Sequence, residues 1–287
     1  MISPNLPKLA SELNSDASCL TSQESPSCPV GSECILPVDL VLQSSDGKLI
    51  GAHRTNMEHF SDGFPTCDSV TSTSEPVPLT EDGETLTLLL RFMHKHKYPG
   101  LTPMDAASIF ALAEAAEKYM VYSAMASSHA YIEHNCKEHP VLSLCYAVKF
   151  DYPAIADAVS SLTLLVSLEE IQRLSISNHR LVYAWFRYRE VYLSVATSIL
   201  DRYATGARVK EHDCPFWDRY LKGTAAKIPP TSTETLKSIA DEGIEKILDD
   251  EYVQILKSCD TCRDRETGWR AHTRKRILQA PKFSELL

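Results

Sequence analysis

Four side chains in the last third of the chain are of the types that bind zinc. They form two pairs, His212-x-Cys214 and Cys259-x-x-Cys262. Thiolate and imidazole are the ligands of structural zinc sites, and the Cys-x-x-Cys spacing is that of a zinc knuckle. The first pair has one residue between its ligands, fewer than usual, and the chain must fold back through a helix to join the pairs. A zinc site at these four residues is one hypothesis, with Trp217 and Trp269 packed beside it.

Other interpretations of these residues stay open. His272 lies one helical face beyond Cys262 and is a substitute fourth ligand. The thiols can also be plain buried side chains, because cysteine is among the most buried residue types. A redox role for Cys259 and Cys262 would require a βαβ pattern around them, which the sequence lacks.

The remaining histidines and cysteines favour structural interpretations. His53 is predicted at a strand–helix junction, where we expect a scaffold ring hydrogen-bonded to the backbone rather than a switch or ligand. His94–Lys97 could contact a partner or chelate a metal through its His-x-His pair, but a solvated helix end, where cations complement the helix dipole, is the favoured interpretation. Cys19, Cys28 and Cys34 match no metal pattern in their spacing, so flexible thiols are expected.

The sequence contains no G-x-S-x-G, P-loop or H-E-x-x-H motif. We therefore expect a non-enzymatic protein. A thiol-based reaction at Cys259 and Cys262 is the enzyme hypothesis that remains.

The elements that would position these residues belong to an α+β fold. A β-hairpin is predicted from the β-rich run Asp39–Gln43, the turn at Asp46-Gly47 and the return at Leu49-Ile50. Val77–Leu79 is predicted as an edge strand, because proline is tolerated at sheet edges. The predicted regions are a disordered leader (1–37), an α/β domain with a small sheet (38–137), a helical extension (138–205) and a Cys/His-containing helical segment (206–287).

The later helices are predicted from apolar periodicity and caps. The clearest is Asn178–Tyr203, whose apolar residues recur at steps of three and four over about seven turns. Thr80 or Asp82 is the expected cap of one helix, and Thr102 of the next. Residues 206–232 are predicted as a loop, and 233–250 as a helix.

The first folded stretch resembles the BTB/POZ domain, in the form found in fungal proteins with a helical extension. The matching runs are Asp39-x-Val41, His53-Arg54, Phe60 with Phe64, Leu89-Leu90-Arg91-Phe92-Met93 and Ala115-Ala116-Glu117-Lys118-Tyr119. The resemblance covers about residues 38–135. It implies a protein-interaction module whose domain forms a two-fold dimer.

The resemblance also implies which residues form interfaces. The dimer would use the first strand and first helix, through Leu40, Leu42, Met57 and Phe60. A further, unidentified protein partner would bind the helical extension. A ubiquitin-ligase adaptor role is an alternative, although Met104-Asp105-Ala106 lacks the acid of the family's cullin-binding motif.

The net charge of −9 argues against a general nucleic-acid or membrane-surface binder. The sequence contains no run of about 18 apolar residues, so we expect no transmembrane helix. The cysteines are scattered and no secretory signal is recognisable, so we expect a cytoplasmic or nuclear protein with reduced thiols. A zinc-stabilised transcriptional regulator, reading DNA with the basic helix after Cys262, is an alternative. We expect that basic face to pair instead with acidic residues of 241–251.

Overall fold

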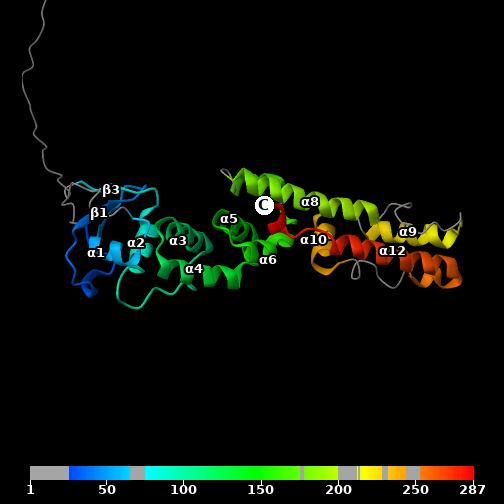
Figure 1. The fold of residues 1–287 in the computed structure, drawn as a ribbon, viewed down its shortest axis with the longest axis horizontal. Coiled ribbons are helices and arrows are strands. Elements are labelled where there is room, and N and C mark those ends of the chain that lie inside the picture. Colours follow the sequence, from blue (N-terminus) through cyan, green and yellow to red (C-terminus); the bar gives the residue numbers. More distant parts are fainter. Residues whose placement is uncertain are drawn as a thin grey trace, which may run out of the picture.

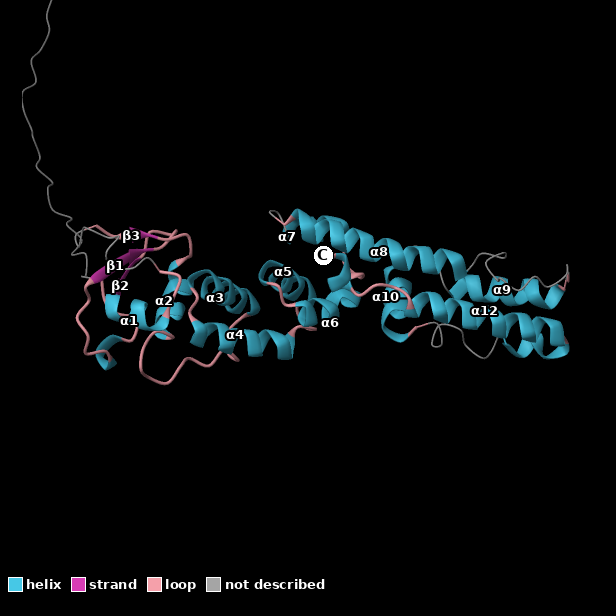
Figure 2. Ribbon diagram, in the orientation of Figure 1, coloured by secondary structure: helices cyan, strands magenta, loops and turns pink. Residues whose placement is uncertain are grey.

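The computed structural model describes residues 26–64, 75–174, 178–199, 212, 214–227, 232–243 and 253–287. The molecule is elongated, with a small sheet at one end and helices along the rest (Figure 1). All strands in the described part lie at that one end (Figure 2). This arrangement agrees with the α+β class predicted from the sequence.

The sheet has three strands in the order β2-β1-β3. β1 (Leu40–Gln43) and β2 (Leu49–Ala52) form the predicted antiparallel hairpin. Gly47 in its turn has a φ of +82°, a conformation that glycine adopts without steric cost. β3 (Val77–Pro78) pairs in parallel with β1 and is the predicted edge strand.

The segment before the sheet is described from residue 26. Residues 26–37, assigned to the disordered leader from the sequence, contain a turn and the short helix η1 (Gly31–Glu33). The Gly51 N–H donates to the Ser27 carbonyl at 3.0 Å, which ties the segment to β2. A Cβ at residue 51 would lie 2.9 Å from the Pro26 carbonyl oxygen, so this close approach requires glycine. Residues 1–25 lie outside the described part.

In the described part of residues 54–135 there are four α-helices: α1 (Arg54–Phe60), α2 (Gly83–Arg91), α3 (Ala106–Tyr119) and α4 (Tyr122–Asn135). The sequence predicted Thr80 or Asp82 as the cap of α2. The cap is Asp82, whose side chain accepts a hydrogen bond from the Thr85 N–H. The predicted cap of α3 at Thr102 is wrong. Asp105 caps this helix, accepting from Ser108, because its carboxylate follows the turn at Thr102-Pro103.

The core of this domain lies between the sheet and the faces of α2 and α3. Leu42 of β1 is 1% exposed, and Leu86, Leu89, Ile109 and Leu112 of the two helices are fully buried. These leucines and isoleucine recur at steps of three, the spacing that places them on one helix face. Burying each such side chain contributes about 1.5–3 kcal/mol.

The helices of the second region are α5 (Pro140–Phe150), α6 (Pro153–Thr163), α7 (Leu168–Leu174), α8 (His179–Ile199), α9 (Pro215–Lys227), α10 (Thr233–Glu242) and α12 (Asp260–Leu278). Two short helices, η3 (Gln254–Ser258) and η4 (Phe283–Leu286), flank α12. The loop predicted over 206–232 is wrong where the structure describes it, because α9 lies there. Pro215 starts α9, a position that proline favours, and the buried Trp217 and Tyr220 lie on one of its faces.

α8 is the long apolar helix predicted from the sequence. Leu181, Trp185, Tyr188 and Tyr192 form its buried stripe. The Trp185 Nε1–H donates to the Thr163 hydroxyl at 3.0 Å, which satisfies the one polar atom that this ring buries. The predicted last turn, 200–203, lies outside the described residues. Among the helices the structure describes, none has the length and apolarity to cross a membrane.

Candidate metal centres

The structure brings His212, Cys214, Cys259 and Cys262 together. One ligand atom from each lies within 4.8 Å of the others. His212 Nε2 and Cys259 Sγ are 3.2 Å apart. A zinc tetrahedron with Zn–S of about 2.3 Å and Zn–N of about 2.0 Å has edges of about 3.3–3.8 Å, so these four side chains fit a zinc ion. His272 is exposed on α12 and is not a member of this group.

The cysteines of this C-terminal cluster are positioned by the starts of two helices. Cys214 directly precedes α9, and the Trp217 N–H donates to its carbonyl at 3.0 Å. Cys259 is the N-cap of α12, and Cys262 lies in the first turn of the same helix. A residue at the cap and another three positions on face the same side, which is why Cys-x-x-Cys at a helix start presents both sulfurs to one point.

Three buried aromatic side chains lie on the two helices that begin at the cluster cysteines. Trp217, Tyr220 and Trp269 are each about 1% exposed. The Tyr220 ring lies 5.3 Å from the Trp217 ring and 6.1 Å from the Trp269 ring, and the Arg265 guanidinium lies 4.4 Å above Trp217. These rings and the guanidinium form a small packed core between α9 and α12.

Burial also changes the acidity of the Cys262 thiol. Cys262 is fully buried, and burial together with the neighbouring Cys259 and Cys214 raises its pKa to about 12. A buried thiol resists ionisation because its thiolate has no compensating charge nearby. A bound divalent cation would supply that charge, so the donor set fits a metal chemically as well as geometrically.

A second cluster, made of Cys28, Cys34, His53 and His94, was not predicted. Its four ligand atoms also lie within 4.8 Å of one another. Cys28 and Cys34 are half-buried thiols of an ordered segment, not flexible ones. His94 is 7% exposed and therefore not a solvated helix end, and burial lowers its pKa.

His53 makes the backbone hydrogen bond expected from the sequence, and its second ring nitrogen also faces a thiol of the cluster. Its Nδ1 lies 2.7 Å from the Pro37 carbonyl, while its Nε2 faces the Cys34 thiol at 3.2 Å. No local spacing signals this N-terminal cluster, because His94 lies 66 residues after Cys28. Only the hairpin and the packing of α2 bring these positions together.

The residues predicted for a dimer interface divide into two groups. Leu42 and Met57 are buried in the domain's own core, at 1% and 6% exposed. Leu40 and Phe60 are partly buried and pack against that core. Leu42 and Met57 can therefore support such an interface only indirectly, by packing behind the residues at the surface.

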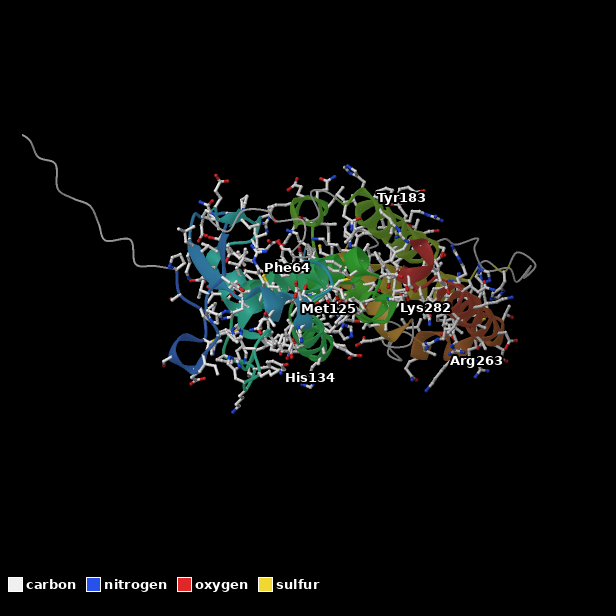
Figure 3. The ribbon with its side chains drawn as sticks, turned by 60° about the vertical axis from the view of Figure 1, so that its left-hand side comes forward. Phe64, Met125, His134, Tyr183, Arg263 and Lys282 are labelled. Atoms are coloured by element: carbon white, nitrogen blue, oxygen red, sulfur yellow. The ribbon has the colours of Figure 1, made fainter. Side chains whose placement is uncertain are left out.

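The helical region carries a groove of about 490 Å³ between α8 and the end of α12. Phe186, Val191 and Ala280 are among its apolar lining residues, and Arg187, Glu190 and Arg276 among its charged ones. Tyr183 and Phe186 of α8 are 62% and 46% exposed, high values for aromatic residues. Tyr183 projects from the upper edge of the molecule in Figure 3.

Two basic residues of α12 pair within their own helix. Arg263 pairs with Asp260, and Arg270 with Glu266. Of the acidic partners expected for them, Asp241 pairs with Lys237, and 249–251 lie outside the described residues. Arg263 is labelled on the lower edge of the molecule in Figure 3. Local pairing of this kind neutralises part of the surface that a DNA-reading helix would need.

The chain matches no family model, no curated protein and no solved structure. The resemblance to BTB/POZ domains therefore stays a prediction from the sequence runs that carry it.

Proposed function

We propose that this protein is a non-enzymatic interaction scaffold, in which a BTB/POZ-like domain carries a helical extension stabilised by a structural zinc centre. The observation that carries the proposal is the C-terminal cluster of His212, Cys214, Cys259 and Cys262. It offers four protein ligands, the number found in structural zinc sites, whereas catalytic zinc keeps one position for water or substrate. Its place at the starts of α9 and α12 suits a structural role.

The order of elements supports the BTB/POZ-like part of the proposal. A hairpin is followed by α1, an edge strand parallel to β1, and then the helices that carry the Leu89–Met93 and Ala115–Tyr119 runs. In this proposal two copies associate through β1 and α1. Leu40 and Phe60, which the domain's own core leaves partly exposed, would contact the second copy.

The groove between α8 and α12 is the proposed partner surface. Its lining includes two guanidinium groups, from Arg187 and Arg276, and one carboxylate, from Glu190. Exposed aromatic side chains flank these charges. Charge complementarity and the aromatic anchors fit a partner segment that is amphipathic and acidic.

Selection from a peptide display library tests the partner surface directly. Acidic peptides with aromatic or aliphatic anchors should be enriched on the full chain. Their binding should fall at least tenfold in Phe186→Asp and Arg276→Glu variants, and stay unchanged in Leu165→Asp, which alters an exposed apolar residue elsewhere. If the enriched peptides bind both groove variants as tightly as the wild type, the groove is not the binding surface.

Metal analysis of the purified chain tests the zinc centre. Zinc should co-purify, and one equivalent should be lost from the Cys259→Ser, Cys262→Ser double variant. Cys145→Ser, which replaces a half-buried thiol of α5 outside both clusters, is the matched control and should keep its zinc. Equal zinc in the double variant and the control would contradict the proposal.

A further inference from the structure

We propose that Cys28, Cys34, His53 and His94 bind a second zinc ion, which fastens the segment before the sheet to the BTB/POZ-like domain. Cys28 Sγ lies 3.2 Å from His94 Nε2, and Cys34 Sγ lies 3.2 Å from His53 Nε2. The two imidazole rings are 5.3 Å apart between centroids and meet at 77°. All four ligand atoms lie within 4.8 Å of one another, and the two sulfur–nitrogen separations are close to the edges of a zinc tetrahedron.

The hydrogen bonds of the two histidines fix which ring nitrogen faces this point. His53 Nδ1 lies 2.7 Å from the Pro37 carbonyl, and His94 Nδ1 lies 2.8 Å from the Leu90 carbonyl. A carbonyl oxygen only accepts, so each Nδ1 must carry the proton. The Nε2 of each neutral ring then presents a lone pair to the thiols. Metal-bound histidines are oriented in the same way, by a backbone carbonyl or carboxylate on the other nitrogen.

Ordinary hydrogen bonding explains this arrangement less well. Two separate thiol–imidazole pairs would satisfy the four groups, and nothing would require the pairs to meet. Here two lone pairs and two thiols share one site, within 4.8 Å of one another. A cation that binds both thiolates and both nitrogens accounts for the convergence. Two sulfur and two nitrogen ligands in this geometry select zinc among the common divalent metals.

The ligands come from separate parts of the chain. Cys28 and Cys34 flank η1 in the segment before the sheet, His53 is the N-cap of α1, and His94 follows α2. The ion would therefore join the leading segment to the domain behind it. Beside it, the Gly51–Ser27 hydrogen bond holds the same segment on β2. Ile35, directly after Cys34, is 96% exposed, so this residue adds no burial to hold the segment.

Zinc content in matched variants of the full chain tests the inference. The wild type and the Cys145→Ser control should contain two equivalents, and the Cys28→Ser, Cys34→Ser double variant one. The Cys259→Ser, Cys262→Ser variant should also contain one, so failure of either site is seen separately. A zinc content that is unchanged by loss of Cys28 and Cys34 would overturn the proposal.

A second measurement uses the wild-type chain and does not depend on the variants' folding. Zinc-loaded and chelator-treated protein are alkylated with iodoacetamide, and each cysteine is quantified by mass spectrometry. Zinc should slow alkylation of Cys28 and Cys34 at least tenfold, and hydrogen exchange over residues 26–38 should slow with it. Equal alkylation of both thiols with and without zinc would contradict the site.

Discussion

Ser284 donates both its backbone N–H and its hydroxyl to the Asp157 carboxylate, at 2.8 and 2.9 Å. The two residues are 127 positions apart, one in η4 and the other in α6. Beside this contact Phe283 is fully buried, with its ring 5.6 Å from that of Tyr188 in α8. The carboxylate thus fixes the end of the chain between α6 and α8, where Figure 1 marks it.

Replacing Asp157 by alanine should release this end. Hydrogen bonds to a charged group contribute about 1.5–3 kcal/mol, so we expect Asp157→Ala to lower the free energy of unfolding by about 2 kcal/mol. Urea denaturation followed by tryptophan fluorescence measures this change. Glu133→Ala, at an exposed position of α4, is the control and should change stability by less than about 0.5 kcal/mol. Equal midpoints for the two variants would show that the contact contributes nothing.

A methyl group at residue 51 should disturb the leading segment. The added Cβ would lie 2.9 Å from the Pro26 carbonyl and from a Val38 methyl, and a backbone carbonyl cannot move aside cheaply. Gly51→Ala should therefore destabilise the protein by about 1–3 kcal/mol and speed hydrogen exchange over residues 26–38. Gly100→Ala places its Cβ in open space and serves as the control. Identical exchange in the two variants would argue against this close approach.

Glu81 should contribute stability that is lost in acid. Partial burial alone raises the pKa of Glu81, but the hydrogen bonds from Lys118 and Tyr119, at 2.7 and 2.6 Å, lower it overall. A carboxyl with a lowered pKa stabilises the fold above its unfolded value of 4.5, and that contribution disappears as pH falls through the folded value.

Glu81→Gln should therefore lower the free energy of unfolding by about 1 kcal/mol at pH 7, a figure reduced because Lys118 is 45% exposed. Denaturing the wild type and the variant at pH values from 7 down into acid measures the difference between their free energies of unfolding. Any effect of metal release is common to both proteins and cancels in this difference. The gap should close below the unfolded pKa. A gap that stays constant to the lowest pH would contradict the assigned role of Glu81.

Self-association through β1 and α1 is measurable by light scattering coupled to size exclusion. At micromolar concentration the wild type should elute with the mass of a dimer. The Leu40→Asp, Phe60→Asp variant should have the mass of a monomer, because two charges would be buried at the centre of the interface. Tyr183→Asp, in α8 of the helical region, should remain dimeric. A monomeric wild type would remove this part of the proposed function.

Elements encoded by neighbouring residues could be predicted from the sequence. Asp46-Gly47 indicated the hairpin, and the apolar steps from Leu181 to Tyr192 indicated α8, because turn chemistry and helical periodicity are local. α9 was missed because Lys210–Asp213 and Lys222-Gly223 gave its surroundings the composition of a loop. Its large apolar residues, Phe216, Trp217, Tyr220 and Leu221, span less than two turns, which is too short a run to show a period.

The two clusters also differ in whether neighbouring residues encode them. Cys259 and Cys262 share one helix turn, so their pairing is visible in the sequence. The ligands of the N-terminal cluster meet only through tertiary packing, since Cys28, His53 and His94 belong to three separate elements. The signal that was missed is the combination of a Cys-rich leading segment with two buried histidines. It could not be recognised in the sequence, because the burial of a histidine depends on the fold.

The placement of Cys214 before α9 and Cys259 before α12 has an electrostatic consequence. A zinc ion with three thiolates and one neutral imidazole has a net charge of −1, whereas the Cys28–His94 set would be neutral. The anionic centre would lie at the N-terminal ends of two helices, each equivalent to roughly half a positive charge. Ion, thiolates and helix ends would together form a nearly neutral unit.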